Sequence, residues 1–373
     1  MHDAEGKPPS GAAGTGRRAE LDGMRGLAMA GVLGIHANNL LPGGHLGVSL
    51  FFVLSGHLIT TLLLAQFRAT GRVDLRRFSL LRAARLLPAL ALVLAVSGAT
   101  LAAFGEPSHT VALGIGASAL FGANLVTAYA DSGAMQLFTW AWTLSQEEQF
   151  YLLWPALLAA ALRRRRVTLL AAAAVLLSLT AEVLRCVLPF GTPQQWARIY
   201  TGPDTRMDGL LIGCLLALAL ARRPLPPRPR WAPALAFGSL AVITAGYVAG
   251  GLGSRVTYSL WIGAVQLAAA ALILAVTADR TGRPARLLAA RPLAHAGRIS
   301  YGLYLWNVPV HLAVQHVLHG AVPVWVNGLA WLGATLFLAE TSHRLLEQPV
   351  LTRVRTSTRG PAPRRDVLLP TAP

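Results

Sequence analysis

The sequence predicts an all-α integral membrane protein with about ten transmembrane helices, one further re-entrant or interfacial segment, and both termini in the cytoplasm. Of the 373 residues, 54% are hydrophobic and 13% are charged, and many apolar runs approach the ~20 residues that a bilayer-spanning helix needs. The arginines behind the net charge of +17 lie in short connections between those runs. Because they form no single basic face, they indicate membrane topology, and we expect no nucleic-acid partner.

The predicted membrane domain covers residues 21–350, with no internal repeat and no soluble domain. Its apolar segments lie at about 24–42, 47–66, 87–104, 111–130, 140–161, 167–189, 207–221, 231–250, 258–278, 299–319 and 322–340. Residues 1–20 and 351–373 are rich in Pro, Gly and Arg without an apolar period, and we expect them to be disordered cytoplasmic tails.

The arginine-rich connections indicate which segments cross the membrane, because cytoplasmic loops carry the excess of Lys and Arg. With the N-terminus inside, the connections expected in the cytoplasm are 68–85, 163–166, 222–230, 280–298 and the chain from 344 onward. All five connections can lie in the cytoplasm only if the chain crosses the membrane twice between 87 and 161. Three apolar segments occur there. One of these should therefore be re-entrant or interfacial. We expect a multi-pass protein of the cell membrane, the inner membrane of a bacterium.

Cysteine usage predicts neither a disulfide framework nor a metal site. Cys186 and Cys214 are the two cysteines, and neither has a Cys or His partner at ligand spacing. We expect no metal, no structural disulfide and no permanently bound cofactor.

Ionisable residues interrupt the first apolar segment, LDGMRGLAMAGVLGIHA at 21–37. Arg25 and His36 are eleven positions apart, close to three helical turns, so they share a helix face about 16 Å apart along the axis. His36 is expected well inside the hydrocarbon zone, where an ionisable group is a functional candidate by default. For Arg25, a role at the headgroups as a topological anchor is a serious alternative.

Two carboxylates enter an apolar helix in WTLSQEEQFYLLWP at 142–155. Glu147 and Glu148 differ by ~100° around the helix, so at most one should face a given cavity. If the helix runs inward to Arg163, Glu148 lies roughly 20 Å above the cytoplasmic edge, a depth similar to that of His36. The alternative is structural, because Ser145 and Glu148 have the spacing of a capping box at a helix N-terminus.

Four arginines precede a helix in RRFSLLRAARLLP at 76–88. Arg82 and Arg85 are three positions apart and would form a fork suited to phosphate oxygens, with Arg76 and Arg77 nearby. Anchoring of the cytoplasmic side remains the alternative.

Together these stretches resemble acyltransferase family three, whose members O-acylate sugars, glycans and some antibiotics, over residues 21 to about 350. The family's basic residue, ten spacers and histidine match Arg25 and His36. The other motifs that carry the resemblance are GVSLFFVLSGHLI, SQEEQFYLLWP, RMDGLLIG, GRISYGLYLWNVPV and RLLEQPV.

The sequence departs from the family pattern at three positions. Ser49 stands where an acidic residue is frequent, His57 where Phe is frequent, and Asn307 where histidine is common. Asn307 can hydrogen-bond but cannot exchange a proton near neutral pH. His311, one turn further on, could replace it. His57 is the second candidate for the base, with a packing role as its alternative.

The resemblance implies transfer of an acyl group, which we expect to be acetyl, from cytoplasmic acyl-CoA to a hydroxyl of a sugar, a cell-surface glycan or a glycosylated small molecule. The arginines at 76, 77, 82 and 85 would hold the coenzyme phosphates, and Arg25 would orient the coenzyme. His36 would act as general base, oriented by Glu148 or Glu147, although an acyl-histidine intermediate is also possible chemistry. Side chains that could contact substrate are Tyr151, Arg206, Asp208, Tyr304 and Asn307, where Arg206 and Asp208 could instead only cap a helix.

Two other functions fit the same ionisable residues. In a proton-coupled transporter, His36, His57 and Glu148 would form a proton relay across the bilayer. In a structural membrane protein, replacing His36 would have no functional effect. The absence of an internal repeat argues against the transporter.

Overall fold

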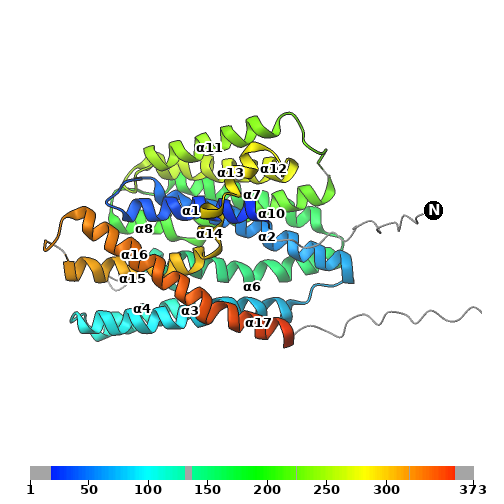
Figure 1. The fold of residues 1–373 in the computed structure, drawn as a ribbon. Coiled ribbons are helices and arrows are strands. Elements are labelled where there is room, and N and C mark those ends of the chain that lie inside the picture. The colour runs from blue at the N-terminus through cyan, green and yellow to red at the C-terminus, as the bar shows by residue number, and fades with distance from the viewer. Residues whose placement is uncertain (1–17, 131–136, 224, 319, 358–373) are drawn as a thin grey trace, which may run out of the picture.

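The structure, a computed structural model, describes residues 18–130, 137–223, 225–318 and 320–357. All regular structure in these ranges is helical (Figure 1). The elements up to the middle of the chain are α1 Ala19–His36, η1 Gly44–Leu46, α2 Gly47–Thr70, α3 Leu75–Ala103, α4 Ser108–Ala119, α5 Ala123–Tyr129, α6 Ala141–Arg163, α7 Val167–Val187, α8 Pro193–Thr201 and α9 Pro203–Arg206. The remaining elements are α10 Asp208–Arg222, α11 Ala232–Ala249, η3 Thr257–Trp261, α12 Ile262–Ala278, α13 Arg283–Leu288, α14 Arg291–Arg298, α15 Ser300–Leu318, α16 Val324–Ser342, η4 His343–Glu347 and α17 Gln348–Ser357.

Long helices run roughly side by side in one bundle, and α2 and α17 end at the same end of it (Figure 1). Five helical stretches are long and apolar enough to cross a membrane: Gly44–Thr70, Leu75–Ala103, Val167–Val187, Ala232–Ala249 and Thr257–Ala278. The predicted all-α membrane class is therefore supported among the described residues, whereas about ten crossings and cytoplasmic termini stay predictions.

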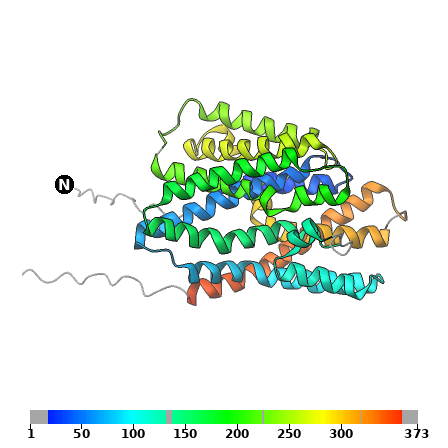
Figure 2. The same ribbon diagram turned by 180° about the vertical axis from the view of Figure 1, so that it is seen from behind.

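The predicted segment 111–130 does not form one helix. It is divided between α4, of 12 residues, and α5, of 7 residues, and between them Phe121 has a φ of +54°. A 12-residue helix is roughly 18 Å long, too short for a hydrocarbon core of ~30 Å. Of the three segments between 87 and 161, only α3 is among the helices long and apolar enough to cross, so which of the others does not span stays a prediction. Helix α4 lies beside α3 (Figure 2).

The first predicted segment also ends early. Helix α1 stops at His36 because Asn38 and Asn39 adopt positive φ angles of 50° and 58°, which end an α-helix. Leu40, the next residue, is 75% exposed. His36 is therefore at the end of its own helix.

Helices α13 and α14 occupy part of the connection 280–298, which was expected to be a cytoplasmic loop. They pack directly on α1 at glycines: a Cβ at Gly23 would lie 1.7 Å from the carbonyl oxygen of Leu288, and one at Gly297 equally close to that of Asp22. Because only hydrogen fits at these positions, the backbone of α1 is held against both short helices. This contact fixes the height of Arg25 in the bundle.

The predicted tails lie largely outside the described residues. At the N-terminal side α1 begins at Ala19, and at the C-terminal side α17 continues the helical structure to Ser357. Residues 351–357 are thus helical, and the disorder expected for 1–17 and 358–373 falls outside the described ranges.

Candidate active site

A cavity with about 100 Å³ of water-accessible space lies between α1, α2, α3, α6 and α15. Four of the predicted arginines and carboxylates line it: Arg25 on α1, Arg82 and Arg85 on α3, and Glu147 on α6. The other lining side chains are those of Val48, Phe51, Phe52, Ser55, Arg82, Leu86, Thr143, Leu144, Tyr151, Ser300, Tyr301 and Tyr304. Residues far apart in the sequence therefore meet in one polar cavity inside the bundle.

Arg82 is the centre of an ion-pair network in the cavity wall. Its Nη2 lies 2.5 Å from Oε1 of Glu148 and 3.7 Å from Oε2 of Glu147, and its Nε donates to Glu148 Oε1 at 2.7 Å. The guanidinium carbon is 3.3 Å from the ring centroid of Tyr151, and Ser55 Oγ donates to Glu147 Oε1 at 2.9 Å. Both carboxylates thus contact one cation, although only Glu147 lines the cavity.

The capping-box alternative for Glu148 is not what the structure shows. Helix α6 begins at Ala141, four residues before Ser145. The hydroxyl of Ser145 donates to the carbonyl of Ala141 and accepts from the backbone N–H of Ala123. Glu148 is therefore inside the helix, where its partner is Arg82.

The four arginines of α3 occupy two different environments. Arg76 and Arg77 are exposed near the start of the helix, whereas Arg82 and Arg85 are partly buried and line the cavity. From Arg76 to Arg85 the helix rises about 13 Å. Arg85 is within electrostatic range of Arg25, Arg82 and Glu347. The expected fork of Arg82 and Arg85 thus has one arm already bound to carboxylates.

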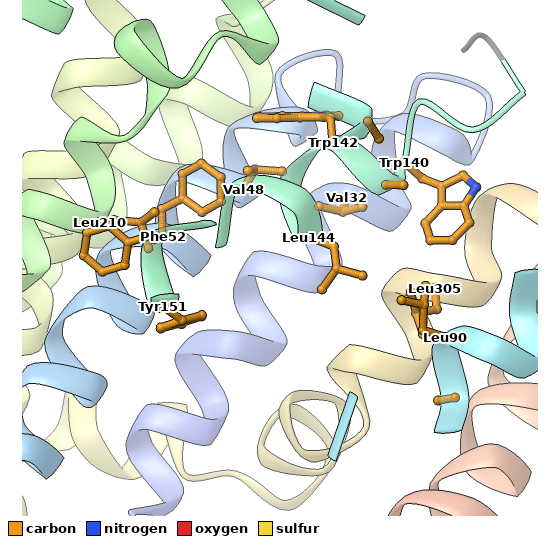
Figure 3. Close-up of a cluster of buried hydrophobic side chains, with 14 of the residues drawn as sticks. Val32, Val48, Phe52, Leu90, Trp140, Trp142, Leu144, Tyr151, Leu210 and Leu305 are labelled. Atoms are coloured by element: carbon orange, nitrogen blue, oxygen red, sulfur yellow. The ribbon is translucent and has the colours of Figure 1, made fainter. Parts of the chain in front are cut away.

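Tyr304, on α15, is held in the cavity wall by two hydrogen bonds. Its hydroxyl accepts from Thr143 Oγ1 at 2.6 Å and donates to the carbonyl of Trp140 at 2.7 Å. Tyr301, one turn earlier on α15, donates to the carbonyl of Leu86 at 2.8 Å. Val32 and Leu144 belong to a cluster of buried hydrophobic side chains inside the bundle (Figure 3).

His36 does not line the cavity and does not contact Glu147 or Glu148. Its ring lies 6.0 Å from that of His311 and 6.4 Å from that of Trp331. Its Nδ1 is 2.7 Å from the carbonyl oxygen of Val32. Because a carbonyl oxygen only accepts, this contact places the hydrogen on Nδ1 and leaves the lone pair on Nε2 in the neutral ring.

The neighbours of His36 come from the middle of two other helices. His311 is seven residues, about 10 Å, from the end of α15 at Leu318. Trp331 is 2% exposed and its indole N–H donates to the carbonyl of Asn307 at 2.8 Å. The amide nitrogen of Asn307 donates to the carbonyl of Tyr304. Asn307 is therefore a link between the surroundings of His36 and the cavity wall.

Arg206 and Asp208 lie elsewhere, with a second buried arginine on α7. Asp208 Oδ2 is 2.7 Å from Arg185 Nη2, and Asp208 Oδ1 accepts from Gln266 at 3.0 Å. Arg206 precedes α10 and is fully buried. Asp208 is the first residue of α10, but its carboxylate bonds to side chains of other helices, so it does more than cap its own helix.

His57, the second candidate for the base, is 3% exposed on α2 and packs against α10. It is absent from the cavity lining. No group of three or more potential His, Cys, Asp or Glu ligands with metal-binding geometry occurs among the described residues.

Three residues of the polar networks were not singled out from the sequence. Ser55 belongs to the GVSLFFVLSGHLI motif, Glu347 to RLLEQPV and Arg185 to the apolar run 167–189. A lone arginine inside an apolar run is a signal that could have identified Arg185, because intramembrane charges are paired. Glu347 is 4% exposed, and its Oε2 lies 2.9 Å from His343 Nδ1.

The fold and the cavity define a helical membrane protein with a cationic internal site. Comparison with known families assigns it: the family described as acyltransferase domain, family three, matches residues 18–339. The chain therefore belongs to acyltransferase family three, as the sequence motifs predict. No solved structure matches it significantly.

Curated proteins similar to this chain include O-acetyltransferases of Staphylococcus aureus, Bacillus subtilis and Listeria monocytogenes. O-acetyltransferase OatA of Staphylococcus aureus is 31% identical over 354 residues, covering 88% of this chain and 56% of its own length. The putative peptidoglycan O-acetyltransferase YrhL of Bacillus subtilis is 33% identical, with 89% and 55% covered, and the peptidoglycan O-acetyltransferase OatA of Listeria monocytogenes is 30% identical, with 88% and 55% covered. The chain thus spans a little over half the length of these relatives. Their names describe acyl transfer, so the transporter alternative is not favoured.

Proposed function

We propose that this protein transfers an acetyl group from cytoplasmic acyl-CoA to a hydroxyl of a cell-surface glycan, with peptidoglycan as the first acceptor to test. The observation that carries the proposal is the cavity in which Arg25 and Arg85 meet, on the same helix α1 that ends at His36. The names of the relatives from Bacillus subtilis and Listeria monocytogenes support the acceptor class.

The donor would enter from the end of the bundle where α3 begins. Coenzyme A is polyanionic and cannot dissolve in hydrocarbon, so its phosphates need cationic partners at the entrance. The exposed Arg76 and Arg77 are suited to this contact, and Arg85 with Arg25 offers further cations about 13 Å deeper along α3. Only the neutral pantetheine arm would continue toward His36.

Arg82 would take part in a different way from the other arginines. Its charge is already matched by Glu148 at 2.5 Å and approached by Glu147. We therefore assign Glu147 and Glu148 to holding Arg82 in the cavity wall, in place of the orientation of His36 expected from the sequence. The cavity then keeps the guanidinium groups of Arg25 and Arg85 for the donor.

His36 would act as the general base through Nε2. Its Nδ1–H is held by Val32, which fixes the tautomer with a basic Nε2. The acceptor hydroxyl would give its proton to Nε2 while its oxygen attacks the thioester carbonyl. Collapse of the tetrahedral intermediate would break the C–S bond, and the imidazolium would return the proton to the leaving thiolate. The products are an O-acyl glycan and free coenzyme A.

The proposal is tested with purified protein in detergent, acetyl-CoA radiolabelled in the acetyl group, and soluble peptidoglycan fragments. We expect label in the glycan as a base-labile ester, with release of one thiol for each ester formed, and loss of both in His36→Ala. Binding of acetyl-CoA without any turnover, with acceptor present and the protein folded, would contradict an enzymatic role. Labelled protein trapped before acceptor addition would instead indicate an acyl-histidine intermediate.

A further inference from the structure

Buried polar atoms without hydrogen-bond partners gather around Arg206. Its side chain is fully buried, its Nη2 lies 3.5 Å from Ser49 Oγ, and its Nε and Nη1 have no partner among the described residues. His45 is 4% exposed; the backbone of Pro42 lies near its ring, but neither ring nitrogen makes a hydrogen bond of normal geometry. Native proteins satisfy nearly all buried polar groups, so several such atoms together indicate a ligand site.

Arg206 also lacks a carboxylate of its own. The two acidic residues nearest in sequence are both engaged elsewhere: Asp204 pairs with Arg198, and the two oxygens of Asp208 bond to Arg185 and Gln266. Glu182 is likewise bound to Arg185. A buried guanidinium without an anionic partner is unfavourable, because its hydration is lost and not replaced.

Aromatic rings surround the guanidinium in place of an acidic partner. The Arg206 guanidinium carbon lies 5.6 Å from the ring centroid of Trp142 and 5.5 Å from that of Tyr200. The two rings are 4.8 Å apart, and the ring of His45 lies 5.8 Å from Tyr200. Tyr200, on α8, is the partly exposed member, so the cluster reaches the loop between α7 and α10.

This Arg206 cluster, defined as His45, Ser49, Trp142, Tyr200 and Arg206, adjoins the cavity described above. Val48 and Thr143, the chain neighbours of Ser49 and Trp142, both line that cavity. The Phe52 ring also lines it and meets Trp142 edge to face at 6.0 Å. The cluster thus touches the cavity through the contact between Trp142 and Phe52.

We propose that the Arg206 cluster is the acceptor subsite and binds a sugar through an oxygen, carbonyl or carboxylate, that accepts hydrogen bonds from Arg206. The unpartnered Nε and Nη1 each keep an N–H donor, on opposite sides of Nη2, which lies 3.5 Å from Ser49 Oγ, so each can donate to a separate ligand oxygen. His45 can donate or accept and so suits a sugar hydroxyl, and Trp142 and Tyr200 offer apolar faces. The choice of a sugar rests on the proposed function, whereas the oxygen contact follows from Arg206 itself.

The subsite is tested by equilibrium dialysis, which measures binding of a tritiated peptidoglycan disaccharide to the full chain in detergent. No acyl-CoA is present. We expect Arg206→Gln to weaken binding about tenfold, and Arg206→Lys, which keeps the charge but loses the fork, to weaken it roughly fivefold. Arg198→Gln is the matched control, because Arg198 lies nearby on α8 and pairs with Asp204; its affinity should stay within about twofold.

A methyl ester of the same disaccharide lacks the carboxylate. Its binding distinguishes a contact of Arg206 with the carboxylate from a contact with a carbonyl. If the ester binds the wild type about tenfold more weakly, Arg206 contacts the carboxylate; if it binds equally and still loses affinity in Arg206→Gln, the contact is to a carbonyl. Undetectable binding to the wild type, or equal binding to wild type and Arg206→Lys with both folded, would overturn the subsite. Because no donor is present, failure of acetyl transfer would leave this result unaffected.

Discussion

Arg25 and His36 share a helix face, yet the structure gives them different surroundings. Arg25 lines the cationic cavity, whereas His36 is surrounded by His311 and Trp331. Two ionisable residues on one helix face are therefore in two different environments of the bundle. Their separation of about 16 Å follows from the helical rise alone.

That separation predicts different kinetic effects. His36→Ala should lower the turnover number by roughly 10²–10⁴, the usual contribution of a general base, with the KM for acetyl-CoA nearly unchanged. Arg25→Ala should raise the KM for acetyl-CoA about tenfold with a smaller effect on turnover. Steady-state kinetics on purified variants measures both, with Arg72→Ala, exposed in the α2–α3 turn, as the control. The same change in turnover number and in KM in both variants would contradict the separate roles of His36 and Arg25.

The two adjacent glutamates offer a matched pair of substitutions. Glu148→Gln removes the partner 2.5 Å from Arg82, whereas Glu147→Gln removes one at 3.7 Å. Because these side chains are 13–20% exposed, solvent screens part of the interaction, and we expect Glu148→Gln to destabilise by about 1–3 kcal/mol and Glu147→Gln by less. Thermal unfolding in detergent measures the difference, and the reverse order would contradict the assigned pairing.

At the scale of elements, α13 and α14 determine where α1 sits. Neither helix has an apolar run of membrane length, so hydropathy predicts a loop at 280–298. Their contact with α1 depends on glycines of both partners, which hydropathy does not detect.

Filling that contact should loosen the helices. In Gly297→Ala the added methyl would overlap the carbonyl of Asp22, so the backbones must move apart, and we expect a loss of about 1–3 kcal/mol. Gly238→Ala on α11 is the control, since no atom lies within 4 Å of its added Cβ. Half-lives of thermal inactivation in detergent compare the two, and equal half-lives would exclude a packing role for Gly297.

At the scale of the whole molecule, apolar runs and arginine-rich connections predicted the helical class and most helix positions. The motifs predicted the family, which the comparisons confirm. The pairing of Arg82 with Glu148 could not be predicted from spacing, because the residues are 66 positions apart and meet only through packing of α3 and α6. The break inside 111–130 was also hidden, since Phe121 and Gly122 leave its hydropathy almost unchanged.

The predicted topology can be tested by labelling single cysteines in a Cys186→Ser background. Under that topology, Gly253→Cys in the exposed turn between α11 and η3 lies outside, and Arg72→Cys between α2 and α3 lies inside. A membrane-impermeant maleimide added to intact spheroplasts should modify the first and should modify the second only after permeabilisation. Labelling of both before permeabilisation, or of Arg72→Cys alone, would overturn the predicted orientation.

The rigid rise of α1 has a consequence for donor choice. The donor phosphates would be held by the arginines, and the base His36 lies about 16 Å beyond Arg25 along α1. This distance would select donors by their length rather than by their acyl group. A short donor such as acetyl phosphate cannot occupy both places at once, so it should acetylate at least about tenfold more slowly than acetyl-CoA at equal concentration. Comparable rates with the two donors would show that the distance from arginine to histidine plays no part in selection.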